Sequence, residues 1–334
     1  MIYTETSFNK KTILITGGAG FIGSSLAFFF QKHYPDSRIV VFDCFRNEET
    51  FSNGNLKSFG HYKNLIGFKG DIVCGDINNP ADLKLLDETK FDYIFHEAAI
   101  SDTRVYDQEI VIKTNVNSFN WFLEKTKKDN ATLVYASSAA TYGSMSSPQR
   151  IGHENPENPY GYSKYAMDQI AEKFSELNPG IKIVGLRFFN VYGPREYFKD
   201  KTSSMVIQLG HQILSGNPPR LFEESDKIFR DFIFINDVLQ ANIKACESKK
   251  NGVFNVGTGK ARSFQDIVDI LQRELRTNYP TEYFPNPYSG YQMHTQADIS
   301  LSEENFNFKP AFSLEEGIKN YIPYIKEMNN SPIN

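Results

Sequence analysis

A short apolar run near the start of this 334-residue chain leads directly into a glycine-rich turn. The run 12–16 reads Thr-Ile-Leu-Ile-Thr, and the glycines after it are spaced as Gly17, Gly20 and Gly23. Glycines let the backbone approach a pyrophosphate, and the N-terminus of a following helix offers unpaired N–H groups and a positive dipole end to the anion. The pattern therefore predicts a strand–turn–helix unit that binds a dinucleotide.

The residues after the turn strengthen this prediction. Leu26 and Phe30 continue an apolar helical pattern, and 38–42 is a second apolar strand that ends at Asp43, 20 residues past Gly23. A carboxylate at that distance can bind adenosine-ribose hydroxyls. The alternative is an ordinary strand–helix turn without a ligand. The glycine spacing, the apolar segments after it and Asp43 together argue against that alternative.

Composition excludes several classes of protein. The net charge of −4 and a pI near 5.9 argue against nucleic-acid or membrane-surface binding, which normally needs a basic face. Cys44, Cys74 and Cys246 are far apart and lack metal-ligand spacing, so we expect reduced thiols and no metal site. The polar segment 1–11 and the absence of a run of about 18 apolar residues favour a cytoplasmic protein.

Five apolar, strand-like runs are separated by segments long enough for crossover helices. They are 13–16, 39–42, 93–96, 133–137 and 183–188. This order is typical of an α/β fold with a doubly wound parallel sheet. We expect a dinucleotide-binding domain over 1–189 and a mainly substrate-binding lobe over 190–330, with some segments returning to the main sheet.

Several other segments carry weaker predictions. Residues 46–70 lack periodicity, and we interpret them as a long irregular loop that covers the adenosine end of the dinucleotide. In the second half of the chain we expect helices over 203–215, 235–248 and 263–277.

A serine, a tyrosine and a lysine form the candidate catalytic set. The run 133–138 delivers Ser138 to its carboxyl end, where ligands lie in open α/β sheets. Tyr160 and Lys164 follow and are four residues apart, so on a helix they share a face, and the ammonium can lower the pKa of the tyrosine. Such a tyrosine can take a proton from an alcohol while hydride leaves to a nicotinamide.

The tyrosine–lysine spacing alone is weak evidence. With 18 tyrosines, roughly one such pair is expected by accident. The chain contains a second pair, Tyr197 and Lys201. Only Tyr160 follows the strand that ends at Ser138 and opens a helix with an apolar stripe. We therefore interpret Tyr160 as catalytic and Tyr197 as a packing or surface residue.

Four motifs resemble the extended short-chain dehydrogenase/reductases that act on nucleotide sugars, and they cover almost the whole chain. They are 16–23, His96-Glu97-Ala98-Ala99, the set Ser138/Tyr160/Lys164, and 187–195. The resemblance implies a Rossmann-type fold with a smaller C-terminal lobe and makes the Ser/Tyr/Lys set catalytic. The residues it implies for the dinucleotide are Gly17, Gly20, Phe21, Ile22, Gly23, Asp43, Cys44, Arg46, Asp76, Ile77, Glu97, Ala98, Ala99, Ile100, Ser101, Asn115, Lys164 and Val191.

Within this family the match is narrower. The segments 189–196 with Lys199, 221–223, 230–232, 254–259 and 291–298 resemble the ADP-heptose 6-epimerases. That resemblance implies an isomerase that inverts C6 of the heptose through a 6-keto intermediate and returns hydride to the opposite face. The product would be a precursor of the lipopolysaccharide inner core.

For hydride to return to the opposite face of C6, both faces must be presented to one nicotinamide, and this calls for acid/base groups in two positions. The resemblance implies Tyr160 for one and Lys199 for the other. Lys201 is a competitor for the second position, and a solvated loop lysine is the alternative for Lys199.

The resemblance also implies a binding site for the ADP half of the substrate in the second lobe. The residues concerned are Asn190, Lys199, Lys201, Gln208, Phe222, Glu223, Glu224, Ser225, Arg230 and Tyr291. Arg230 would pair with the diphosphate, and an ordinary salt bridge to Asp231 or Asp237 is its alternative. Gln208 departs from the histidine of some relatives.

Three other functions compete with this interpretation. A UDP-hexose 4-epimerase uses the same Ser/Tyr/Lys set. A 4,6-dehydratase needs an acidic pair beside the strand-end hydroxyl, whereas Ser138 is followed by Ala139 and Ala140. A non-catalytic dinucleotide-binding regulator would not need the whole set.

Cofactor and partners follow from the same residues. Asp43 favours NAD, whereas Arg46, Lys57 and Lys63 can pair with a 2′-phosphate. The enzymes that the chain resembles favour NADP, so we expect NADP, with NAD as the alternative. We expect a nucleotide-sugar substrate, no nucleic-acid or membrane partner, and a homo-oligomer, which by resemblance is a homopentamer.

Overall fold

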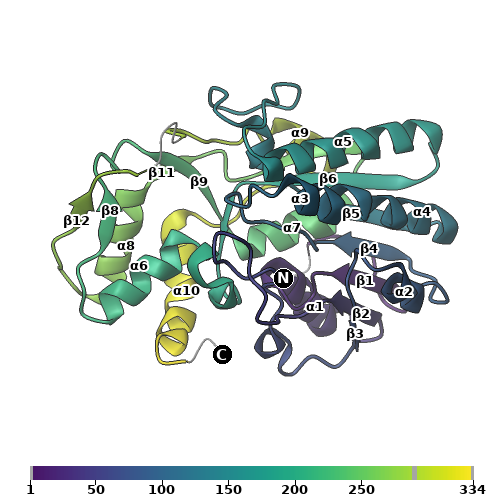
Figure 1. The fold of residues 1–334 in the computed structure, drawn as a ribbon, viewed down its shortest axis with the longest axis horizontal. Helices are drawn as coiled ribbons and strands as arrows, with labels where there is room; N and C mark the ends of the chain where they lie inside the picture. Colours follow the sequence, from purple (N-terminus) through teal and green to yellow (C-terminus); the bar gives the residue numbers. More distant parts are fainter. Residues whose placement is uncertain (1–2, 288–291, 332–334) are drawn as a thin grey trace.

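A seven-stranded parallel sheet forms the larger part of the molecule (Figure 1). The structure is a computed structural model that describes residues 3–287 and 292–331. The strand order is β10-β6-β5-β4-β1-β2-β3. The strands are β1 (Thr12–Thr16), β2 (Arg38–Asp43), β3 (Asp71–Cys74), β4 (Tyr93–His96), β5 (Thr132–Ser138), β6 (Lys182–Phe188) and β10 (Gly252–Val256). The α/β fold class predicted from the sequence is confirmed.

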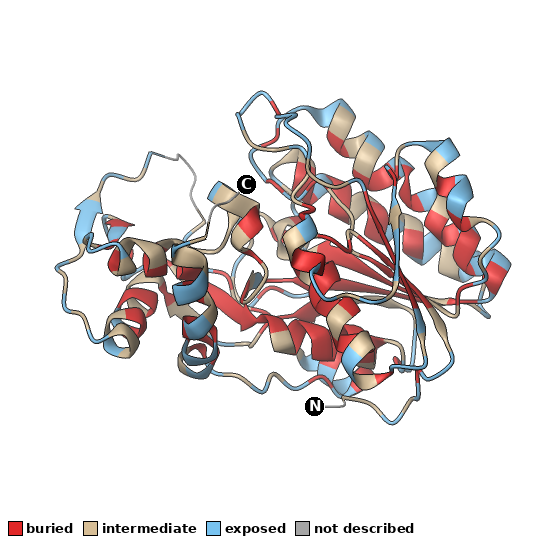
Figure 2. Cartoon of the chain, turned by 90° about the horizontal axis from the view of Figure 1, so that it is seen from below, coloured by how far each residue is buried: buried red, intermediate tan, exposed pale blue. Residues whose placement is uncertain are grey.

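Helices cover both faces of this sheet, and the central strands are buried between them (Figure 2). α1 and α7 pack together over one face, and α4 and α5 lie over the other. Strands enclosed on both faces need continuous apolar runs, which is what β1, β2 and β5 have. The helices are α1 (Phe21–His33), α2 (Pro80–Leu83), α3 (Gln108–Ile112), α4 (Phe119–Asp129), α5 (Pro159–Leu177), α6 (Met205–Leu214), α7 (Ile235–Ala245), α8 (Phe264–Leu275), α9 (Ser300–Phe306) and α10 (Leu314–Asn329).

The strand order reverses at β1, which pairs with β2 on one side and β4 on the other. Thr16, the last residue of β1, is in register with Phe42 and with His96. The loops that follow these strands therefore leave the sheet side by side. This switch point is where open α/β sheets bind their ligands.

A smaller lobe lies beside the sheet (Figure 1). It holds β7 (Asn190–Tyr192), β9 (Phe229–Phe234) and β11 (Ala261–Ser263) in one sheet and β8 (Arg220–Phe222) with β12 (Glu282–Phe284) in another. α6, α8 and α10 pack against one another in this lobe. Its apolar core continues into the core around α1 and α7, so the two parts share one hydrophobic cluster.

The sequence pattern did not predict β3 or β10. Three of the four residues of β3 are exposed, so it lacks the apolar run that marks the other strands of the main sheet. β10 follows residue 190, yet it pairs with β6 and extends the main sheet. The division at residue 189 stays a prediction. Among the described residues, no helix is long and apolar enough to cross a membrane.

Residues 46–70 form the irregular loop that was predicted, apart from one short turn, η1 (Tyr62–Leu65). The three helices expected in the second half are present as α6, α7 and α8, each shorter than predicted. The loop returns from the end of β2 to the glycine turn, where the backbone N–H of His61 donates to the carbonyl of Ala19 (3.0 Å).

Candidate active site

The glycine turn joins β1 to α1 at the switch point. Gly17 has φ +63°, and a Cβ there would lie 2.8 Å from the backbone N of Ala98. A Cβ on Gly23 would lie 2.3 Å from the carbonyl oxygen of Gly17. Both positions therefore require glycine for the fold itself.

Gly20 differs from its two neighbours in the motif. A Cβ there would meet only the carbonyl oxygen of Gly17, at 3.1 Å, and its φ is −81°. α1 begins after Gly20 without a side-chain N-cap. A helix N-terminus without a side-chain cap, beside a glycine that exposes its backbone, fits a bound pyrophosphate.

Asp43 lies at the end of β2, where it was predicted. One carboxylate oxygen accepts the N–H of Ala19 (2.9 Å), and the other accepts the N–H of Phe45 (2.8 Å). Burial raises the pKa of Asp43, and these two hydrogen bonds oppose the rise. Asp43 therefore anchors the glycine turn. Each of its carboxylate oxygens keeps a second lone pair, which could accept a hydrogen bond from a ribose hydroxyl.

The loop after β4 is tied to the catalytic helix by Asn115. Its carbonyl oxygen accepts the N–H of Ile100 (2.8 Å), and its amide donates to the carbonyl of Ile100 (3.0 Å) and to the hydroxyl of Ser163 (2.9 Å). Asn115 lies in a π-helical turn, η3 (Lys113–Asn117). Such turns often occur at functional sites.

Glu97 follows β4 and faces the same region. Both of its carboxylate oxygens are buried, and neither has a hydrogen-bond partner among the described residues. Burial raises the pKa of Glu97 to about 8, against a smaller opposing effect of the Lys164 charge. Burial makes the charged form of a carboxyl group without partners unfavourable, so the group stays neutral at pH values below its raised pKa.

Most of the other residues predicted for the dinucleotide follow strands of the main sheet, whereas Val191 lies in β7 of the smaller lobe. Cys44, Asp76 and Ser101 are exposed, Ile77 and Ile100 are buried, and Ala98, Ala99 and Val191 are intermediate.

Ser138, Tyr160 and Lys164 are brought together by β5 and the start of α5. Asn158 caps α5 by accepting the N–H of Gly161 (2.8 Å). Tyr160 is buried and forms a hydrogen bond with the Ser138 hydroxyl. The Lys164 ammonium donates to the carbonyl of Ala136 (2.7 Å) and lies 6.0 Å from the centroid of the Tyr160 ring.

The predicted pKa shift of Tyr160 is wrong in direction. Burial raises the pKa of Tyr160, the Ser138 hydrogen bond lowers it, and the charges of Glu97 and Asp168 raise it further. Burial also lowers the pKa of Lys164, to about 8. The spacing within the helix indicated the nearby lysine correctly, but it did not reveal the burial or the carboxylates of Glu97 and Asp168.

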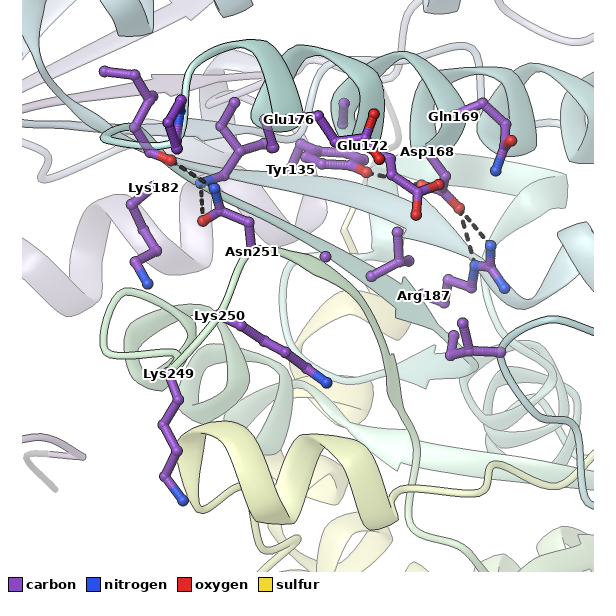
Figure 3. A pocket seen from close by; sticks show the side chains of 18 of the residues that line it. Tyr135, Asp168, Gln169, Glu172, Glu176, Lys182, Arg187, Lys249, Lys250 and Asn251 are labelled. Atoms are coloured by element: carbon purple, nitrogen blue, oxygen red, sulfur yellow. Dashed lines mark hydrogen bonds and ion pairs between the residues drawn. The ribbon is translucent and has the colours of Figure 1, made fainter.

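Asp168 is a site residue that the sequence analysis missed. Its carboxylate accepts a hydrogen bond from Tyr135 (3.0 Å) and pairs with Arg187 (2.8 Å) (Figure 3). It also accepts a hydrogen bond from Ser137 (2.9 Å). These contacts join α5 to β5 and β6 one turn after Lys164. An acid four residues beyond Lys164 on the same helix face was the signal in the sequence.

A separate cavity of about 680 Å³ lies next to Asp168, between α5 and the start of β10 (Figure 3). Its described lining includes Glu172, Lys182 and Asn251, and it includes neither Tyr160 nor the glycine turn. The cavity therefore lies apart from the candidate chemistry, which is at the carboxyl ends of the strands.

The structure distinguishes the two candidate lysines, which lie in the short turn η5 (Tyr197–Thr202). The Lys199 ammonium lies 6.0 Å from the centroid of the Phe21 ring, at the start of α1. Burial lowers the pKa of Lys199, while the charges of Glu196 and Asp102 raise it. Lys201 is exposed. Lys199 therefore faces the glycine turn.

Arg230 is buried in β9 and donates to the carbonyls of Phe229 (2.8 Å) and Gln292. The carboxylate of Asp231 accepts backbone N–H groups, including that of Gly259 (2.9 Å), and Asp237 accepts that of Ala311 (2.8 Å). These contacts of Asp231 and Asp237 are with backbone N–H groups, and they do not favour the predicted alternative of a salt bridge to Arg230.

The remaining residues predicted for the substrate are spread over the smaller lobe. The Gln208 amide donates to the carbonyl of Ser203 (2.7 Å), and Glu224 pairs with Lys227 on the surface. Asn190 and Glu223 are exposed, Phe222 is half-buried and Ser225 is buried. Tyr291 lies outside the described residues.

Together, the doubly wound sheet, the glycine turn at its switch point and the Ser/Tyr/Lys set at the end of β5 define a Rossmann-type protein of the short-chain dehydrogenase/reductase class. The chain belongs to the NAD dependent epimerase/dehydratase family, whose model matches residues 13–257.

Individual relatives match over almost the full length. ADP-L-glycero-D-manno-heptose-6-epimerase of Brachyspira hyodysenteriae is 35% identical over 322 residues, which cover 94% of this chain and 98% of that protein. The crystal structure of the Helicobacter pylori enzyme of the same name has a TM-score of 0.89 at 46% identity, covering 98% of this chain and 99% of that one. UDP-glucuronic acid 4-epimerase from Bacillus cereus, in complex with UDP-glucuronic acid and NAD, has a TM-score of 0.80 at 27% identity, covering 95% and 99%.

Proposed function

We propose that this protein converts ADP-D-glycero-D-manno-heptose to ADP-L-glycero-D-manno-heptose by inverting C6. The observation that carries the proposal is a second amine, Lys199, that faces the glycine turn from a different element than Tyr160. A dehydrogenase uses one acid/base group at the reacting oxygen. When the keto group turns between the two hydride transfers, that oxygen moves, so a second group beside its new position can return the proton. The full-length similarity to two enzymes named for this reaction supports the choice of substrate.

In the proposed mechanism, Tyr160 carries out one proton transfer and Lys199 the other. A bound nicotinamide dinucleotide supplies the hydride acceptor and donor. Tyr160 takes the proton of the C6 hydroxyl as the C6 hydrogen leaves as hydride, and Ser138 orients the oxygen. The 6-keto group then turns, and the Lys199 ammonium donates a proton to its oxygen as hydride returns to the opposite face. Proton exchange with solvent then restores the starting forms of Tyr160 and Lys199. Lys164 supplies positive charge near the Tyr160 ring.

We propose NADP as the dinucleotide. Arg46 follows β2 on the adenosine side, and its Nε and Nη1 atoms are buried without a partner among the described residues. Its Nη2 atom donates to the carbonyl of Phe198. A guanidinium with free donors suits a 2′-phosphate. Mass spectrometry of the dinucleotide extracted from purified protein tests this assignment, and finding only NAD would overturn it.

The alternative is a UDP-hexose 4-epimerase, because UDP-sugar 4-epimerases share the fold at 27% identity. The direct test is incubation with ADP-D-glycero-D-manno-heptose, with the C6 configuration of the product read by NMR. We expect the L-glycero epimer to form. No turnover there, together with activity on UDP-glucose, would favour the alternative. A Tyr160→Phe variant with full activity would favour a mechanism without this tyrosine.

The substrate's ADP half is assigned to the smaller lobe. Arg230 is the proposed partner of the diphosphate because its buried guanidinium is fixed to two carbonyls in β9 and the loop that contains Gln292. An Arg230→Met variant should raise the KM for the nucleotide sugar more than it lowers kcat. An unchanged KM would remove Arg230 from the site.

The proposal also includes a cytoplasmic location, which rests on the widely spaced, unpaired cysteines of the sequence, and a homopentamer, which rests on family resemblance. Light scattering of the purified protein measures the oligomeric state. A monomer would contradict that part of the proposal.

A further inference from the structure

The irregular loop after β2 contacts both halves of the candidate site. Asn64 lies in η1 and is buried. Its side-chain amide donates to the carbonyl of Ala19 in the glycine turn (3.1 Å) and to the carbonyl of Arg195 (3.1 Å). The guanidinium of Arg195 donates in return to the backbone carbonyl of Asn64. One amide group therefore joins the glycine turn to the segment that carries Lys199.

His61 makes a second connection between the same two segments. Its backbone N–H donates to the carbonyl of Ala19 (3.0 Å), and its ring stacks on Phe198 with centroids 4.0 Å apart and planes 8° apart. Arg46 donates to the carbonyl of Phe198. Phe198, the residue before Lys199, is thus held through both its ring and its main chain.

The Lys199 segment has a backbone that needs such support. Arg195 has φ +82° and Asp200 has φ +50°, which are unfavourable for residues other than glycine. On the side away from the loop, the Glu196 carboxylate accepts the N–H of Gly193 (3.0 Å) and the hydroxyl of Ser204 (2.8 Å). Contacts on two sides therefore keep the segment in a conformation that it would not adopt alone.

We propose that Asn64, supported by His61, is a positioning residue for Lys199. The bridge makes the glycine turn and the second acid/base group one rigid unit, so that Lys199 keeps its place beside the glycine turn. The proposal rests on the proposed function, because it assigns Lys199 to one of two half-reactions. Tyr160 is held separately, by the start of α5 and by Ser138.

Asn64→Asp is the sharpest variant, because it keeps the size of the side chain but removes its donor and places a carboxylate beside two carbonyl oxygens. The protein is mixed with each C6 epimer separately, and the single-turnover appearance of reduced dinucleotide is followed by absorbance. We expect a roughly 10–100-fold slower rate with one epimer and little change with the other, since small misplacement of a catalytic group costs this much. Lys199→Ala identifies which epimer depends on Lys199.

Asn251→Asp is the matched control. The Asn251 amide donates to the carbonyl of Ile181 (2.6 Å), and its oxygen accepts the N–H of Ile183 (3.1 Å), so it also joins two segments (Figure 3). It lies at the amino end of β6, away from the carboxyl ends of the strands. We expect it to leave the ratio of the two single-turnover rates as in the wild type.

Chemical labelling gives a readout that does not depend on activity. Brief acylation followed by peptide mass spectrometry compares Lys199 with the exposed Lys201 on the same peptide segment. Asn64→Asp should raise the labelling of Lys199 relative to Lys201. His61→Ala should do the same, and His61→Phe, which retains a stacked ring on Phe198, should restore low labelling.

The outcomes separate the two proposals. Equal slowing with both epimers, or unchanged Lys199 labelling in both Asn64→Asp and His61→Ala, would overturn the positioning role. A wild-type protein that interconverts neither epimer would overturn the proposed function instead.

Discussion

At the scale of single residues, burial assigns different environments to Lys199 and Lys201, which are only two positions apart. Lys199 faces Phe21 and has a lowered pKa, whereas Lys201 lies in solvent. A lowered pKa brings an amine closer to the range in which it both gives and takes protons. Sequence alone left the two open, because the choice depends on how the η5 turn folds against the glycine turn.

Substituting the two lysines tests this difference. Lys199→Met should lower the rate of epimerisation by roughly 10²–10⁴-fold, the usual contribution of a general acid or base. Lys201→Met is the control and should remain close to wild type. NMR of the C6 protons measures both rates. A larger loss in Lys201→Met would exchange the two assignments.

Glu97 should make stability depend on pH. Its pKa is raised to about 8 in the folded protein, whereas an unfolded chain ionises near the ordinary glutamate value of 4.5. The unfolded state therefore loses its proton first, and folding becomes less favourable as the pH rises from about 4.5 to about 8.

Glu97→Gln removes this dependence. The variant should raise the melting temperature relative to wild type at pH 8 by several degrees and change it little at pH 5. Thermal unfolding of both proteins at the two pH values measures the difference. An equal shift at both pH values would mean that Glu97 is ionised in the folded protein.

At the scale of elements, the glycine turn must both pack closely within the chain and leave its backbone accessible to a dinucleotide. Gly17 and Gly23 are required by packing within the chain, whereas a Cβ on Gly20 would make a single close contact, 3.1 Å from the Gly17 carbonyl oxygen. The spacing in the sequence predicted the turn, the strand before it and the helix after it. It did not distinguish the folding role of two glycines from the binding role of the third.

Alanine substitutions separate these roles once the dinucleotide has been removed with charcoal. Gly23→Ala should destabilise the protein by about 1–3 kcal/mol, because its Cβ overlaps the Gly17 carbonyl oxygen. Gly20→Ala should lose less stability than Gly23→Ala, because its Cβ would lie 3.1 Å rather than 2.3 Å from the Gly17 carbonyl oxygen, and yet bind dinucleotide more weakly. Thermal unfolding and dinucleotide titration measure the two effects. Gly20→Ala with normal binding would contradict the pyrophosphate assignment.

The elements that the sequence analysis missed share a physical reason. β3 is mostly exposed, and β10 is a short run interrupted by Asn255, so neither has the continuous apolar pattern by which the other strands of the main sheet were predicted. The pKa of Tyr160 was predicted in the wrong direction for a related reason. Its carboxylate neighbours, Glu97 and Asp168, are brought together by the sheet rather than by helical spacing.

At the scale of the whole molecule, the sheet and the smaller lobe share a core, and the candidate groups come from both. Tyr160 belongs to the helix over the main sheet, and Lys199 follows β7 of the smaller lobe. The loop 46–70 joins the segment that carries Lys199 to the glycine turn, whereas Tyr160 is held separately. The fold class and most of the candidate residues could be predicted from motifs, whereas the contacts between distant segments required the folded chain.

The central claim is that C6 is inverted by removing hydride and returning that same hydride to the opposite face. The most direct measurement uses ADP-D-glycero-D-manno-heptose carrying deuterium at C6, incubated in ordinary water and examined by NMR. The account predicts an L-glycero product that retains its deuterium at C6. A product with hydrogen at C6, or no product at all, would contradict it.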